Sequence, residues 1–174
     1  MNASFLLRAA PICALSLLCV GCLAKYEAVT NGGSSTVVMT RSAMHLGRTS
    51  LQTYDAFSND SCTKAASRGR LSALLTNGIK ASKSTKVASG EAIYIQATTS
   101  MWGGRRVEPD PGTVAISEDR CINFFWFTPL PGHQYELKQQ APTLSECSVE
   151  VTDLATQLPP EDLTVGDAQH CSII

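Results

Sequence analysis

Cys121-Ile-Asn-Phe-Phe-Trp-Phe-Thr128 and the Pro129-Leu-Pro-Gly132 run directly behind it are the stretch that decides the fold. The first eight residues combine β-branched and aromatic side chains in a run too short for a stable helix, and the second run supplies turn residues. On an extended chain the side chains alternate between two faces, both mostly apolar, so a central strand covered on both sides is expected. Tyr135 and Leu137 return after the turn, and the pattern predicts a β-hairpin.

Weaker strand patterns flank this hairpin. They cover residues 36–40, 48–58, 92–98, 112–117 and 147–152. The clearest is 92–98, where Ile93 and Ile95 alternate with Tyr94 and Gln96. We therefore expect a mainly β domain, an antiparallel β-sandwich of about seven strands.

Other segments predict irregular structure. In residues 62–77 the leucines have helical spacing, but Gly69 argues against a regular helix. This segment therefore predicts a short helix or irregular crossover, with a strand over 70–75 as the alternative. Two glycines and two prolines predict a long loop over 101–111. Residues 118–120 predict a turn. The chain from Asp153 onward predicts a loose tail.

The N-terminus has the layout of an export signal. Arg8 is its single positive charge, and the apolar run behind it spans roughly 13 residues, shorter than the ~20 that a membrane-spanning helix needs. Leu18-Cys19-Val20-Gly21-Cys22 then resembles the lipobox of bacterial lipoprotein precursors. The resemblance implies a signal over 1–21 and a lipid on Cys22, where two or more acyl chains give stable membrane anchoring. In the alternative, an ordinary signal is cleaved and Cys22 is one more thiol.

Removal of residues 1–21 leaves 153 residues, enough for one domain. The segment 22–35 is predicted to be the lipidated cysteine and a flexible tether, because Gly and Ser dominate its second half. Residues 36–174 then form the domain. Thirteen basic residues face 15 acidic ones, so no nucleic acid partner is expected. No Asp follows Cys22, and in lipoproteins this implies the outer membrane, here on its periplasmic face.

Four cysteines remain in the predicted domain: Cys62, Cys121, Cys147 and Cys171. An even number in an exported chain predicts two disulfides, for which three pairings exist. Strand geometry places Cys121 and Cys147 at the same end of a sheet and favours that pair, which leaves Cys62 with Cys171. The chain has no C-x-x-C pair and its histidines are scattered, so neither a metal nor another cofactor is predicted.

The expected loop over 101–111 mixes apolar and charged groups, as binding surfaces do. It predicts a contact patch of Trp102, Arg105 and Arg106 for an envelope protein or an anionic envelope polymer. In the alternative, Trp102 folds back onto the core and the arginines pair with Glu108 and Asp110, and the large apolar area of tryptophan favours this alternative.

Residues for catalysis are not evident. The sequence lacks G-x-S-x-G, and His133 lies in a turn, where a solvated loop residue is expected rather than a general base. Glu118 and Asp119 are adjacent, so in an extended chain their carboxylates point apart and do not form a glycosidase pair. No enzymatic activity is predicted.

The region 90–153 is similar to small bacterial envelope lipoproteins with transthyretin-like β-sandwich domains. The similarity is carried by Phe127, Thr128, Pro129, Gly132, Tyr135, Cys147 and Val151. It implies a fold, and no activity comes with it. The expected function is a structural or binding module anchored to the outer membrane. The alternatives are an accessory subunit of an envelope secretion or transport assembly and a cell-wall hydrolase.

Overall fold

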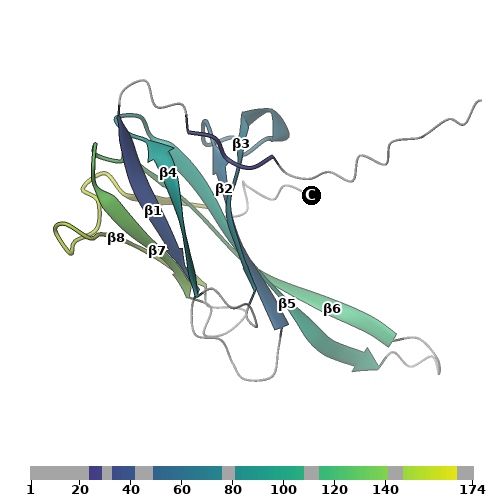
Figure 1. The fold of residues 1–174 in the computed structure, drawn as a ribbon. Coiled ribbons are helices and arrows are strands. Elements are labelled where there is room, and N and C mark those ends of the chain that lie inside the picture. Colours follow the sequence, from purple (N-terminus) through teal and green to yellow (C-terminus); the bar gives the residue numbers. More distant parts are fainter. Residues whose placement is uncertain are drawn as a thin grey trace, which may run out of the picture.

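Two β-sheets lie face to face in the computed structural model (Figure 1), which describes residues 24–28, 33–41, 49–75, 81–107, 114–140 and 147–167. In these residues the strands are β1 Ser34–Thr40, β2 Thr49–Phe57, β3 Ser67–Leu75, β4 Ser82–Ala88, β5 Ile93–Val107, β6 Val114–Phe127, β7 Gln134–Gln140, β8 Ser148–Asp153 and β9 Thr164–Gly166. One 3-10 helix, η1, spans Lys64–Ala66. None of the described residues belongs to a helix with the length and apolar character needed to cross a bilayer.

The four-stranded sheet has the order β4-β1-β7-β8, and the five-stranded sheet has the order β3-β2-β5-β6-β9. Neighbouring strands are antiparallel except for β1 and β7, which are parallel. The core fills the space between the sheets. Its largest fully buried side chains include Tyr54, Tyr135, Phe125, Phe127, Met39, Leu71, Ile95 and Leu137. The predicted mainly β sandwich is confirmed, with nine strands in the described residues.

The predicted hairpin at 121–138 is wrong, because β6 and β7 belong to different sheets. Pro129 and Pro131 have no N–H group to donate to a ladder. The groups beside them bond elsewhere: the Gly90 N–H donates to the Pro129 carbonyl (2.9 Å), and the Gly132 N–H donates to the Ser34 carbonyl (3.0 Å). The Pro-Leu-Pro-Gly run therefore carries the chain from one sheet to the other.

The predicted alternation within β6 is confirmed. Phe125 and Phe127 lie in the central core. Phe124 and Trp126 lie in a second cluster with Phe57 and the half-buried Tyr94. We call Tyr94, Phe124 and Trp126 the aromatic cluster, in which neighbouring ring centroids are 5.6–6.3 Å apart. Both faces of this strand are thus covered.

The loop predicted over 101–111 and the turn predicted over 118–120 are wrong in the described residues. There β5 and β6 stay paired from Ile93 and Phe127 out to Val107 and Val114. The register shifts between Trp102 and Gly104, as expected of a β-bulge, which accommodates glycine. Residues 103–107 and 114–117, here called the β5–β6 arm, continue past the last β2 partner of β5 at Trp102. Figure 1 shows the arm reaching beyond the other strands.

Two edges of the sheets also depart from expectation. The strand alternative for 70–75 is correct, since β3 follows the short helix η1 directly. Strand β4 was not predicted, because its alternation is hidden: Val87 is its single fully buried side chain. Its exposed lysines, Lys83 and Lys86, are typical of an edge strand.

Both ends of the described chain are more ordered than predicted. Tyr26 is buried in the core, so the predicted tether over 22–35 is wrong at 24–28, and β1 begins two residues before the predicted boundary at 36. The loose tail predicted after Asp153 is wrong as well, because β9 pairs with β6. In both places backbone groups bond to a sheet edge, which side-chain patterns do not reveal.

The predicted Cys121–Cys147 disulfide is confirmed, with 5.8 Å between the Cα atoms. It links β6 to the residue before β8 and so joins the two sheets. Cys121 lies within β6 rather than at its start. Cys62 is also disulfide-bonded. Cys171 lies outside the described residues, so the Cys62–Cys171 pairing stays a prediction.

Candidate functional site

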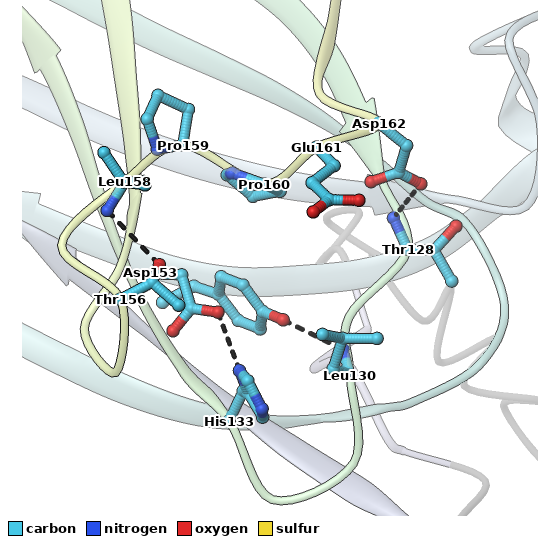
Figure 2. A pocket seen from close by; sticks show the side chains of 11 residues that line it. Thr128, Leu130, His133, Asp153, Thr156, Leu158, Pro159, Pro160, Glu161 and Asp162 are labelled. Carbon is cyan, nitrogen blue, oxygen red and sulfur yellow. Dashed lines mark hydrogen bonds and ion pairs between the residues drawn. The ribbon is translucent and has the colours of Figure 1, made fainter.

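A pocket of about 340 Å³ lies where the β6–β7 connection meets the β8–β9 connection (Figure 2). Its walls are mostly apolar and come from Leu130, Tyr135, Leu158, Pro159 and Pro160. Its polar groups are Thr128, His133, Asp153, Thr156, Glu161 and Asp162. An apolar hollow with a few convergent polar groups is the usual form of a small-ligand or side-chain binding site.

Asp153, the last residue of β8, builds one side of the pocket. Its carboxylate accepts from the Ala155 N–H (2.9 Å), and its own N–H donates to the Leu158 carbonyl (2.9 Å). Gln157 takes a positive φ of 61° between them, which lets the turn close. This turn places Leu158 and the two prolines opposite the β6–β7 connection, as Figure 2 shows.

His133 contacts the same carboxylate from the other connection. Its Nδ1 lies 2.7 Å from Asp153 Oδ2, and Asp153 is 5% exposed. Burial acts to raise the pKa of Asp153, but the hydrogen bonds from His133 and from the Ala155 and Thr156 N–H groups outweigh it and hold the pKa below its usual value.

Tyr135 forms the floor beside this pair. Its hydroxyl oxygen accepts from the Leu130 N–H (2.9 Å), and its ring stacks near His133 at a centroid distance of 6.2 Å. Burial raises the pKa of Tyr135, and the nearby negative charges of Asp153 and Asp162 raise it further. The hydroxyl therefore stays neutral and fixes the path of the β6–β7 connection.

The rim of the pocket is acidic. Glu161 and Asp162 are exposed, and Asp162 accepts from the Thr128 N–H (2.9 Å), which ties the two connections together. Negative charge beside apolar walls suits a ligand with an apolar body and a cationic or hydrogen-bond-donating end.

His133 was predicted to be a solvated loop residue, and the structure corrects this, because its ring is paired with Asp153 and about two-thirds covered. Sequence reasoning missed the pocket. His133 lies in the β6–β7 connection and Asp153 ends β8, 20 residues further along the chain. In the sequence, only the turn-forming residues near each of them indicate this site.

The predicted contact residues Trp102, Arg105 and Arg106 lie together on β5 rather than in a loop. Trp102 is at the base of the arm, opposite Glu118, and the two arginines are in the arm, opposite Ile116 and Ala115. Glu108 and Asp110, their alternative partners, lie outside the described residues, as do the predicted signal over 1–21, Cys22 and Cys171. The structure thus separates the arm from the pocket.

Within the described part of the chain, no group of three or more His, Cys, Asp or Glu side chains could hold a metal ion. Comparisons with protein-family models, with curated proteins and with solved structures found no match for this chain.

Proposed function

We propose that the chain is a lipoprotein of the bacterial envelope, anchored to the periplasmic face of the outer membrane through Cys22, whose β-sandwich acts as a binding module and not as an enzyme. The observation that carries the proposal is the Cys121–Cys147 disulfide between the sheets. Disulfides persist in oxidising compartments, and the lipobox-like run at residues 18–22 supplies the route there.

The binding site of this module is the pocket beside His133 and Asp153. The site takes an apolar side chain or small group with a cationic end, because its walls are apolar and its rim carries Glu161 and Asp162. Leu158, which is 64% exposed, extends the apolar surface outward from the pocket. A segment of an envelope protein partner offers this combination of groups.

A second candidate function is an accessory subunit of an envelope secretion or transport assembly. The observation that favours it is the β5–β6 arm, which continues past the sandwich and carries Arg105 and Arg106. Outside its own β5–β6 pairing, the arm has no strand partner among the described residues, so it offers strand edges and positive charge to a neighbouring subunit or to an anionic polymer.

The anchoring is tested with two cysteine variants. Cys22→Ser removes the proposed acylation site, and Cys13→Ser is the matched control, since Cys13 lies in the predicted signal but outside the lipobox-like run. The intact mass of membrane-extracted protein, measured without reduction, is expected to show acyl chains on the wild type and on Cys13→Ser but not on Cys22→Ser. A wild-type chain that begins at Met1, or acylation that survives Cys22→Ser, contradicts the proposal.

The pocket is tested by placing a charge at its mouth. Leu158→Glu should abolish recovery of a stoichiometric partner after mild detergent extraction, because a buried carboxylate without a partner is costly. Leu75→Glu is the control: Leu75 is 51% exposed and lies on β3, outside the pocket. Equal partner recovery with both variants would exclude the pocket as the contact site and leave the arm as the candidate.

A further inference from the structure

The first described residues are attached to the sandwich and do not form a tether. The Tyr26 N–H donates to the Arg70 carbonyl (3.1 Å), and the Arg70 N–H donates to the Ala24 carbonyl (2.8 Å), which adds Lys25 as a bridge to the edge of β3 that faces away from β2. The Tyr26 side chain is 5% exposed and belongs to the central core. Two backbone hydrogen bonds and a buried aromatic ring hold this segment in place.

Gly69 is what allows this close approach. Its φ is +104°, a region that residues with a Cβ rarely adopt, and a Cβ there would overlap the Ala24 carbonyl oxygen and lie 2.9 Å from the Tyr26 nitrogen. Glycine at position 69 of β3 therefore makes room for the backbone of the N-terminal segment.

The direction of the segment fixes where the chain enters the domain. The Lys25–Arg70 bridge is parallel, so the chain before Ala24 comes from the end of the sheet at which β3 begins with Ser67. Across the sheet, Ser67 is level with Phe57, Tyr94 and Trp126. Cys22 precedes Ala24 by two residues, which span at most about 7 Å.

We infer that the β3 edge of this end of the sandwich, which we call the anchor end, lies directly against the bilayer, and that the β5–β6 arm projects away from it. The pocket is at the β9 edge of the same end, on the other side of the five-stranded sheet, and stays open to the periplasm. The inference rests on the proposed acylation of Cys22. Val107 lies 13 residues beyond Tyr94 along β5, or about 43 Å at ~3.3 Å per residue. Figure 1 shows the N-terminal segment beside β3 and the arm at the opposite end. The lipid would thus present the arm to the periplasm.

Charge does not set this orientation. The exposed cations on the segments around Ser67 are Lys25, Lys64 and Arg68, and the exposed anions there are Glu27, Asp60 and Glu91. Arg68 lies 4.0 Å from Glu91. Glu161 and Asp162 are exposed at the same end of the sandwich, beside Thr128, so this end has no excess of cations that would attract an anionic bilayer. The short connection from Cys22 to the docked segment holds the anchor end at the bilayer, so the orientation should not depend on ionic strength.

The two tryptophans of the chain test the inference. Trp126 is level with the anchor end, and Trp102 lies eight residues further along the sheet, about 26 Å away. Trp102→Phe and Trp126→Phe each leave one donor. The acylated full-length variants are inserted into phosphatidylethanolamine and phosphatidylglycerol vesicles that carry a dansyl acceptor on a fraction of the headgroups. We expect a several-fold larger loss of donor fluorescence from Trp126 than from Trp102, at low and at high salt. Equal losses would overturn the inference.

An insertion separates this inference from the proposed function. About 12 Gly and Ser residues placed between Leu23 and Ala24 add a flexible span of about 19 Å and leave the fold untouched. The difference between the two tryptophans should then disappear. If the wild-type chain carries no lipid, the proposed function fails. If it carries lipid but the insertion changes nothing, the proposed function stands and the membrane-facing orientation is wrong.

Discussion

At the scale of single residues, Asp153 joins two loops that the sequence leaves unconnected. Its carboxylate receives His133 from the β6–β7 connection and the Ala155 N–H from its own turn. Because the side chain is almost fully covered, these bonds are sheltered from water and hold the pocket closed on that side. The charge of one carboxylate therefore fixes the shape of the candidate binding site.

Asp153→Asn tests this role through pH. The pKa of Asp153 in the folded chain is lowered from its usual value of 3.8, so its contribution to stability is present above about pH 4 and is lost as the pH falls through the lowered pKa. We expect the variant's free energy of unfolding to be about 1–3 kcal/mol lower than that of the wild type at pH 7, and we expect this difference to narrow below pH 4. Urea denaturation between pH 7 and pH 3 measures the difference. Glu161→Gln, at an exposed position of the same pocket, is the control, and a gap that persists at the lowest pH contradicts the assignment.

Tyr54 should limit stability at the alkaline end. It is fully buried, burial raises its pKa to about 12, and its hydroxyl oxygen accepts from the Gln139 N–H (3.2 Å). Its contribution is present below about pH 10, where the unfolded tyrosine ionises, and is lost as the pH rises toward 12. We expect Tyr54→Phe to lower the free energy of unfolding by about 1–3 kcal/mol near neutral pH. Between pH 10 and 12 the variant should lose less further stability than the wild type does. Denaturation at rising pH measures this, with Tyr94→Phe as a half-buried control. Identical alkaline curves for wild type and Tyr54→Phe would refute it.

At the scale of elements, side-chain alternation predicted strands well wherever both faces are covered. The apolar residues Phe125 and Phe127 on one side, with Phe124 and Trp126 on the other, predict a central position for β6 from the sequence alone. The same reasoning failed for β4 and β9, which are held by backbone bonds and bury few side chains. It also failed at Gly103-Gly104, where a shift of register lets the β5–β6 ladder continue through residues that usually end a strand.

The pocket escaped prediction for a related reason. The pocket is formed by the β6–β7 and β8–β9 connections. Two contacts to aspartate side chains hold these connections together: the Thr128 N–H donates to Asp162, and His133 pairs with Asp153. Neither pair shares a periodic pattern or a motif. The turn residues that mark each connection in the sequence do not encode which connection faces which.

Gly69 is the element-scale prediction. Gly69→Ala should strain a φ of +104° and push the N-terminal segment off β3, because the added methyl overlaps Ala24. Trypsin should then cut after Lys25 much faster in the full-length chain, and mass spectrometry should detect a product that begins at Tyr26. The control is Gly90→Ala, whose φ is +81° but whose added Cβ meets nothing within 4 Å. Equal cleavage rates for the two variants would show that the segment is not held by the approach at Gly69.

At the scale of the whole molecule, a buried polar layer and a disulfide join the sheets at one level. The Gln139 side-chain amide, fully buried on β7, donates to the Ala97 carbonyl (3.0 Å) and to Asn123 Oδ1 (3.0 Å), and its oxygen accepts from the Thr99 hydroxyl (2.8 Å). Cys121 and Cys147 form their bond beside this amide, whose nitrogen lies 3.2 Å from Cys121 Sγ. Because these buried polar groups are paired with one another, a sliding of one sheet over the other would leave them without partners. The layer therefore fixes how the two sheets are aligned.

The last prediction separates the disulfide from this polar layer. The cross-link closes a segment with a sequence separation of 26, for which loop entropy gives about 3.5 kcal/mol. Cys121→Ala with Cys147→Ala should lower the free energy of unfolding by about that amount while the fold persists, since Gln139 keeps its oxygen partners. Substitution is preferable to reductant, because Cys62 is also disulfide-bonded and would be reduced too. Urea denaturation measures the change in the free energy of unfolding, and hydrogen exchange of the Gln139 side-chain amide protons reports on the polar layer. If these protons exchange faster in the double variant and stability falls as well, then the disulfide holds the two sheets together and the polar layer depends on it.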